Sequence, residues 1–238
     1  MFETKLKVCI WGDSIFKGVI YSPDLNRHIF INDSCINLIA NEYKLQIENY
    51  SKFGQTSAYA LDKLPKALAL NHDFNYAIIE LGGNDCDYNW KDISTDPDAN
   101  HLAKVSLEDY IHNIESIVLE FKKYSITPII VNLPPIDAER YFRFISTGLN
   151  SDNIHKWLKD VEHIYRVQEM YSLALTKYAY RNGIKVLDLR GDLLAEENYY
   201  QYVCEDGIHI NERGHHKIYE LFVKYIANSI NSDSNNVV

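Results

Sequence analysis

Two short segments near opposite ends of the chain carry residues that could act together in nucleophilic catalysis. Ser14 comes soon after the apolar run that ends at Trp11, and Asp206 and His209 stand three residues apart late in the sequence. A serine hydroxyl becomes a nucleophile when a histidine takes its proton and a carboxylate orients that histidine. The Asp206 carboxylate can fold back onto Nδ1 of His209 and leave Nε2 facing outward as a base. These residue types therefore indicate serine-based hydrolytic chemistry.

Hydrogen-bond donors for a developing oxyanion fall between these two segments. Gly54 follows the second apolar run, and Asn84 follows the third within Gly82-Gly83-Asn84-Asp85. A glycine N–H and an asparagine amide can both donate to a negative oxygen, as can the N–H groups at the start of a helix after Ser14. Each of these groups could therefore donate a hydrogen bond into the same cleft as Ser14.

Each of these features also has an ordinary explanation. Asp13 and Ser14 are good helix caps, and Gly54 suits a plain turn. Asn84 could satisfy its own backbone, and His209 could be one of several surface histidines, since the chain has nine. The functional interpretation rests on their occurring together, each after a strand or before the last helix.

The elements that must position these residues alternate between short apolar runs and helical segments. Three runs are continuously apolar at their centres, as expected for strands covered on both faces. Helical periodicity is clear over 107–121, again around 167–178, where Asn182-Gly183 supplies a C-terminal cap, and in the last helix, which Asn211 can cap. This alternation predicts an α/β fold, a three-layer α/β/α sandwich with a five-stranded parallel sheet. The five predicted strands are Leu6–Trp11, Leu45–Tyr50, Tyr76–Leu81, Thr127–Leu133 and Ile184–Leu189.

Two connections are too long to be simple turns, at 86–104 and 134–162. Both follow the carboxyl ends of predicted strands, where ligands bind in open α/β sheets. We interpret them as active-site insertions of one domain that spans 1–230, followed by a polar tail at 231–238. Their aromatic residues, among them Tyr88, Trp90 and Trp157, would suit stacking on a sugar ring.

Composition limits the possible functions. The net charge of −9 and the scattered basic residues argue against nucleic-acid binding. The four cysteines show no metal-ligand spacing; a reduced cytoplasmic protein is the simpler interpretation, although two disulfides remain an alternative. No secretory signal is visible, and no run of about 18 apolar residues predicts a membrane span. We expect no metal or other cofactor, and oligomeric state is not readable from the sequence.

The arrangement as a whole resembles the SGNH hydrolases, also called GDSL esterases and lipases, over nearly the full chain. Ile15 replaces the usual leucine of the first motif, which is a conservative change. The resemblance implies Ser14 as nucleophile, His209 as general base and then acid, Asp206 as the residue that orients His209, and a flavodoxin-like sheet. It also implies an oxyanion hole made of the Ser14 N–H, the Gly54 N–H and the Asn84 amide, and we expect Asp13 and Asp85 to support the site. The segments that carry it are Gly12-Asp13-Ser14-Ile15 with Gly18, Asn49 to Thr56 around Gly54, Gly82-x-Asn84-Asp85, and Asp206-x-x-His209 with Asn211 and Gly214.

Two other classes of protein use similar elements. A dinuclear metallophosphoesterase would need an early Asp-x-His and a histidine beside the asparagine, and neither is present around Asp13 or Asn84. A non-catalytic binding module would be expected to lack the nucleophile or the base. We therefore expect an esterase that acts on a small soluble carboxylic ester through an acyl-enzyme on Ser14, with a carbohydrate acetylester as the leading guess. A lipase or thioesterase of the same family is the alternative, because the acyl chain and the alcohol are not readable from the sequence.

Overall fold

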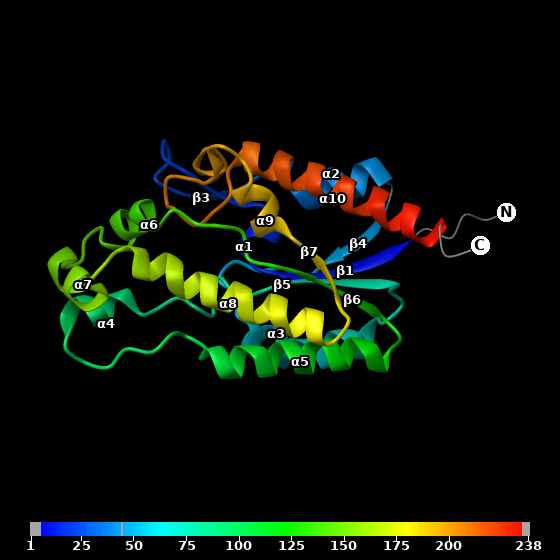
Figure 1. Cartoon of the computed structure of the whole chain (residues 1–238), viewed down its shortest axis with the longest axis horizontal. Helices are drawn as coiled ribbons and strands as arrows, with labels where there is room; N and C mark the ends of the chain where they lie inside the picture. Colours follow the sequence, from blue (N-terminus) through cyan, green and yellow to red (C-terminus); the bar gives the residue numbers. More distant parts are fainter. Residues whose placement is uncertain (1–5, 44, 235–238) are drawn as a thin grey trace.

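The protein is built around a parallel sheet whose two faces are both covered by helices (Figure 1). The computed structural model describes residues 6–43 and 45–234. The sheet has five strands in the order β4-β1-β5-β6-β7, and every neighbouring pair in it is parallel. Its strands are β1 (Lys7–Gly12), β4 (Gln46–Asn49), β5 (Tyr76–Glu80), β6 (Thr127–Val131) and β7 (Lys185–Leu187). The predicted α/β/α sandwich with a five-stranded parallel sheet is thereby confirmed.

Helices pack on the sheet in two groups. Helices α2 and α10 lie together against one face, and α3, α5 and α8 lie against the other (Figure 1). Shorter helices occupy the carboxyl side of the strands. The helices are α1 (Ser14–Lys17), α2 (Cys35–Tyr43), α3 (Ser57–Leu70), α4 (Trp90–Thr95), α5 (Leu107–Lys123), α6 (Ala138–Ile145), α7 (Ser151–Leu158), α8 (Glu162–Arg181), α9 (Leu189–Leu194), the 3-10 helix η1 (Tyr199–Tyr202) and α10 (Glu212–Ser234).

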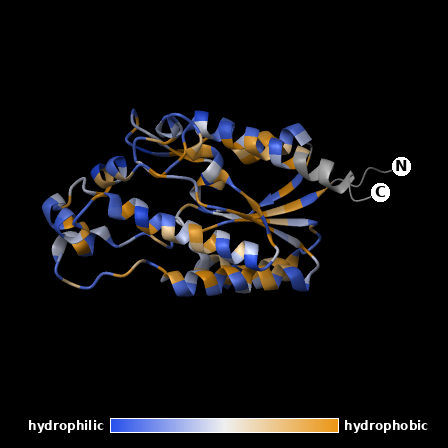
Figure 2. Cartoon of the chain, in the orientation of Figure 1, coloured by the Kyte–Doolittle hydropathy of each residue, from blue (hydrophilic) through white to orange (hydrophobic). Residues whose placement is uncertain are grey.

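Alternate residues of the central strand β1 enter two different cores. Cys9 and Trp11 face α3, α5 and α8, whereas Val8 and Ile10 face α2 and α10. A strand buried on both faces must be apolar at successive positions, which explains the unbroken hydrophobic run in the sequence. Figure 2 shows the consequence, with hydrophobic residues along the strands and hydrophilic residues on the outward faces of the surrounding helices.

The sequence-based boundaries are close to those observed, with local differences. The cap at Asn182-Gly183 is confirmed, since Gly183 has a left-handed φ of 62° directly after α8. Within the predicted helical stretch around 167–178, Val167, Tyr171 and Leu175 form the buried stripe of α8, whereas Met170 is 50% exposed. Helix α10 continues to Ser234, so the first four residues of the expected polar tail are helical, and 235–238 lie outside the described residues.

Both long connections contain helices that pack together beyond the carboxyl ends of the strands. Helix α4 lies in the first connection and α6 and α7 in the second, and a separate hydrophobic cluster joins them through Trp90, Ile93 and Ile154. The sequence analysis did not predict a two-stranded antiparallel hairpin, β2 (Val19–Ser22) with β3 (Arg27–Phe30), which follows α1.

All four cysteines are buried free thiols. Among the helices within the described ranges, none combines the length and the apolar character needed to cross a bilayer.

Candidate active site

The candidate site lies at the carboxyl end of β1, where the order in which strands are added to the sheet changes direction. Strand β1 pairs with β4 on one side and with β5 on the other, so the segments that follow these strands leave a crevice at their carboxyl ends. Ser14 enters this crevice as the first residue of α1, directly after β1. Asp13 caps that short helix by accepting a hydrogen bond of 2.9 Å from the Ile15 N–H. The cap fixes the turn that presents the serine.

A continuous chain of hydrogen bonds joins the three residues expected to carry the chemistry. Oγ of Ser14 lies 2.9 Å from Nε2 of His209, and Nδ1 of the same ring lies 2.5 Å from Oδ2 of Asp206. All three residues are buried, with Asp206 completely inaccessible. A histidine in this position can take the serine proton, and the buried carboxylate can stabilise the resulting imidazolium.

The loop that carries Asp206 and His209 is held in place on both sides. Gly207 adopts a left-handed φ of 82° and packs so tightly on α6 that a Cβ would lie 2.3 Å from the backbone nitrogen of Tyr141. Its carbonyl also accepts a hydrogen bond of 2.8 Å from the Asp137 N–H. On the other side, Oδ1 of Asn211 accepts from the Gly214 N–H, which confirms Asn211 as the cap of α10. The second insertion therefore braces this loop.

The electrostatic environment keeps Asp206 ionised. Burial alone would raise the pKa of this carboxyl, but hydrogen bonds from His209 and the charge of that ring outweigh the effect, so the pKa lies below its usual value. Oδ1 accepts the backbone N–H groups of Ile208 and His209 at 3.2 and 3.1 Å. An ionised Asp206 suits the role of orienting His209, because its carboxylate can only accept hydrogen bonds.

Asn84 lies between the two backbone segments expected to complete the oxyanion hole. Its amide nitrogen is 3.2 Å from Oδ2 of Asp13, next to Ser14, and 3.2 Å from the carbonyl oxygen of Gln55, next to Gly54. Gly54 adopts a left-handed φ of 73° in an exposed turn with open space around its Cα, so backbone conformation favours glycine there. The structure thus brings the three expected donor segments together, although Gly54 does not line the cavity described below.

Asp85 has a different position from the other expected site residues. Its carboxylate accepts hydrogen bonds from the backbone N–H and the hydroxyl of Ser57 at the start of α3. Burial raises the pKa of Asp85 to about 6. It joins the loop after β5 to α3, so its support of the site is indirect.

A second buried carboxyl lies beneath the Ser14 turn. Oε2 of Glu80, the last residue of β5, accepts a hydrogen bond of 3.2 Å from the Asp13 N–H. Burial and the charge of Asp13 raise the pKa of Glu80 well above its usual value, and burial also raises the pKa of Asp13. Burial therefore favours a form of the pair that keeps one proton, because two neighbouring buried charges would lack solvation. Glu80 was missed by the sequence analysis, although a glutamate in an otherwise apolar buried strand was a signal.

A cavity of about 70 Å³ adjoins the serine. Its walls are mainly apolar and come from the segments after β1, β5 and β6 and from α8, with aromatic residues supplied by both insertions. Trp90 Nε1 and the Tyr141 hydroxyl both donate to Oδ1 of Asp87 at 2.8 Å, which joins the two insertions at the cavity wall. The cavity-lining residues include Ser14, Asn84, His209, Tyr88, Trp90, Leu133, Pro134, Ile136, Tyr141, Ile164 and Ile208.

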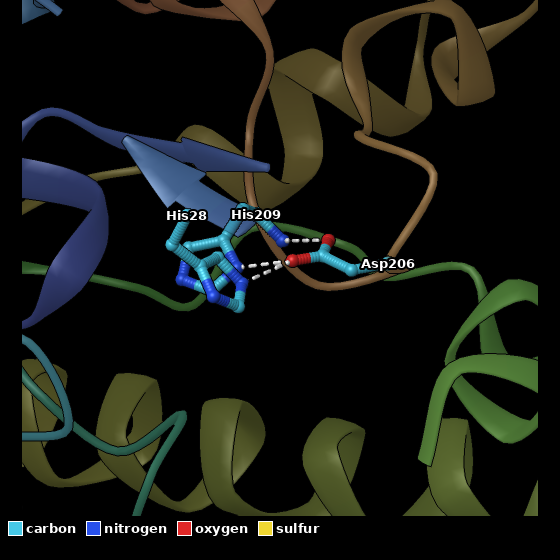
Figure 3. A group of neighbouring side chains, drawn as sticks. All are labelled: His28, Asp206 and His209. Atoms are coloured by element: carbon cyan, nitrogen blue, oxygen red, sulfur yellow. Dashed lines mark hydrogen bonds and ion pairs between the residues drawn. The ribbon is translucent and has the colours of Figure 1, made fainter. Parts of the chain in front are cut away.

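His28 is the other residue at this site that the sequence analysis missed. It comes from β3, and Nε2 of its ring lies 3.0 Å from Oδ2 of Asp206 (Figure 3). His28, Asp206 and His209 each bring one atom that could bind a metal ion to within 4.8 Å of one another. The separations of 2.5 and 3.0 Å around Asp206 are those of hydrogen bonds, which account for this cluster without an ion.

Comparison with known proteins identifies the family. The family model of the GDSL-like lipases and acylhydrolases matches residues 10–217, a segment that contains Ser14, Asn84, Asp206 and His209. The chain belongs to this family. Membership makes it a serine hydrolase of the esterase type and confirms the resemblance noted in the sequence.

Relatives of known sequence or structure agree with this assignment. An isoamyl acetate-hydrolyzing esterase of Saccharomyces cerevisiae is 28% identical over 199 residues, which cover 79% of this chain and 72% of that protein. A lipase/acylhydrolase from Enterococcus faecalis superposes with a TM-score of 0.63 at 16% identity, over 94% of this chain and 96% of its own. A putative acylhydrolase from Bacteroides fragilis gives a TM-score of 0.64 at 16% identity, over 95% and 89%. These two structures show that the fold is shared.

Proposed function

We propose that this GDSL-family enzyme hydrolyses small carboxylic esters with short acyl chains through an acyl-enzyme on Ser14. The observation that carries the proposal is the unbroken hydrogen-bond chain from Ser14 through His209 to Asp206 beside the cavity. In this mechanism His209 takes the Ser14 proton as Oγ attacks the ester carbonyl and then returns it to the leaving alcohol. Water, activated by the same histidine, releases the acid.

The negative oxygen of the tetrahedral intermediate would be held by the N–H groups of Ser14 and Gly54 and by the Asn84 amide. The placement of Asn84 between the other two donor segments supports this role. Donors that are already fixed before the reaction stabilise the developing charge without reorganisation, and each is worth about 3 kcal/mol in the transition state.

The cavity supports a short and apolar ester. At about 70 Å³ it is small beside the ~300–1,000 Å³ typical of sites for drug-sized ligands. Ile136, Ile164 and Ile208 offer aliphatic contacts for an alkyl group. The name of the yeast relative, an esterase of isoamyl acetate, is consistent with an acetyl group on a branched alkyl alcohol.

A carbohydrate acetylester remains the prediction made from the sequence. The aromatic residues that suggested it give limited support, because Trp90 and Tyr141 are buried and contact each other edge to face. A sugar ring stacks on an open aromatic face, and these two rings offer little of one. We therefore favour the alkyl acetate over the acetylated sugar and over a long-chain lipid or thioester.

A substrate panel and a covalent probe test this function together. The wild type should be labelled by a fluorophosphonate and should cleave p-nitrophenyl acetate and isoamyl acetate, with rates that fall through the butyrate and octanoate. Ser14→Ala should lose labelling and turnover, whereas Ser94→Ala, at a buried serine whose hydroxyl donates to the Lys91 carbonyl, should retain both. Rates that rise with acyl length, or an acetylated monosaccharide as the best substrate, would refute the substrate class. Absence of labelling would refute Ser14 as the nucleophile.

The cytoplasmic location is also a proposal. The four free buried cysteines support it, because free thiols are typical of a reducing compartment.

A further inference from the structure

His28 forms a second side-chain hydrogen bond to Asp206, in addition to the one from His209. Its Nε2 lies 3.0 Å from Asp206 Oδ2, the same oxygen that accepts from Nδ1 of His209 (Figure 3). The two imidazole rings lie with their centroids 4.6 Å apart. Asp206 therefore bonds two histidines, one from the final loop and one from the β2–β3 hairpin.

In the hydrogen bond between His28 and Asp206, His28 is the donor. An ionised carboxylate can only accept, so Nε2 of His28 must carry the proton that it shares with Asp206. Oδ1 of Asp206 is occupied by the backbone N–H groups of Ile208 and His209. With His28 and the His209 ring on Oδ2, the carboxylate accepts four hydrogen bonds and is held in one orientation.

The His28 ring is itself held by neighbours from three parts of the chain. Tyr21 on β2 contacts it at 5.4 Å between centroids, Phe53 from the loop after β4 at 5.1 Å, and Phe144 on α6 at 5.9 Å. About a quarter of the His28 side chain is exposed. A histidine packed in this way between aromatic rings can direct its N–H at Asp206 without freedom to turn aside.

We propose that His28 is a positioning residue that fixes the Asp206 carboxylate for its bond to His209. It touches neither the serine nor the cavity, and it reaches the catalytic residues through its hydrogen bond to Asp206 and its ring contact with His209. A ring at position 28 can keep the second contact without the first. When His28 cannot donate, Oδ2 keeps one side-chain bond instead of two, and the carboxylate gains rotational freedom. The His209 ring is then less well oriented in the transition state, whereas substrate binding in the cavity is unchanged. This role rests on the proposed function of Asp206 and His209.

Two variants separate the donor from the ring. His28→Phe keeps a ring among Tyr21, Phe53 and Phe144 but removes the N–H, and we expect kcat for p-nitrophenyl acetate to fall about tenfold, the size of one hydrogen bond to a charged group, with KM changed less than twofold. His28→Gln places an amide N–H near the position of Nε2 and should recover most of kcat. Asn26→Gly removes the same hairpin's hydrogen bond from the Tyr21 hydroxyl, suits the left-handed backbone at this position, and leaves Asp206 and the rings around His28 unaltered, so it should leave kcat unchanged.

A spectroscopic readout makes the test independent of the substrate. The proton between His209 Nδ1 and Asp206 should give a low-field NMR resonance in the wild type that shifts or broadens in His28→Phe and persists in His28→Gln. Wild-type kcat and resonance in His28→Phe would overturn the proposal. An equal loss of kcat in all three variants, accompanied by a raised KM, would also overturn the proposal, since that pattern indicates a general disturbance of the hairpin. A wild type that hydrolyses no ester would instead overturn the proposed function, and the resonance would still report on His28.

Discussion

The buried pair of Glu80 and Asp13 predicts an unusual dependence of stability on pH. Glu80 is 1% exposed, and its raised pKa means that the folded pair retains a proton that the unfolded chain gives up above pH 4.5, the usual value for a glutamate. Glu80→Gln imitates the protonated acid, because its amide oxygen can accept from the Asp13 N–H and its amide hydrogens can donate to the Asp13 carboxylate. The substitution removes the titration while keeping the hydrogen bonds.

The magnitude follows from proton linkage. Above pH 4.5 the folded wild type holds one proton more than the unfolded chain, so its free energy of unfolding falls by about 1.4 kcal/mol per pH unit until the folded pKa is reached. In Glu80→Gln the contribution of Glu80 to this slope is absent, because the amide does not titrate. For each pH unit between 4.5 and the folded pKa, the variant should therefore gain about 1.4 kcal/mol relative to the wild type.

Urea unfolding of both proteins at a series of pH values measures this difference. The gap between the two free energies should widen steadily with pH, with equal m-values. Glu115→Gln, which changes an exposed glutamate on α5, should run parallel to the wild type throughout. If Glu80→Gln also runs parallel to the wild type, Glu80 is ionised in the folded protein and the shared proton is refuted.

Two further substitutions test the geometry of the site. Asn84→Ala should lower kcat by about 10²–10³ with little change in KM, because it removes an oxyanion donor. Asn153→Ala loses only a side-chain hydrogen bond to the Ser94 carbonyl and should leave kcat unchanged. A loss of kcat below fivefold in Asn84→Ala would exclude the assigned role. Gly207→Ala should lower both activity and thermal stability, since its Cβ would collide with the backbone of Tyr141 and Asp137. Gly148 has a similar φ of 75° but open space around it, so Gly148→Ala should cost only the backbone strain, about 1–2 kcal/mol. Equal losses of stability in the two glycine variants would contradict the bracing of the loop by α6.

Much of the fold was predictable because each central strand is buried on both faces. That burial imposes unbroken apolar runs on β1, β5 and β6, and such runs are easy to recognise in an amino-acid sequence. The β2–β3 hairpin was missed because its strands are only four residues long and partly exposed, so apolar and polar residues mix along them. The turn at 23–26, with Pro23 and a left-handed Asn26, was the available signal.

The chemistry-bearing residues of the site were predictable for a different reason. Ser14 and Asn84 follow strands, and the Asp206–His209 pair precedes the last helix, so the sequence marks the place of each in the fold. His28 has no such marker, because its partner Asp206 is 178 residues away and only packing brings them together. Glu80 and Asp87 likewise act through neighbours that no short motif contains.

The hydrogen bond between Ser14 and His209 spans 195 positions of the chain. The nucleophile thus comes from the turn after the first strand and the base from the loop before the last helix, and a contact of such range forms only when both ends of the fold are in place. During synthesis a chain that has not yet emerged past His209 carries an ordinary, unactivated serine hydroxyl. Reactivity toward a fluorophosphonate therefore reports completed folding, and its appearance over time in a refolding experiment would mark the closing step.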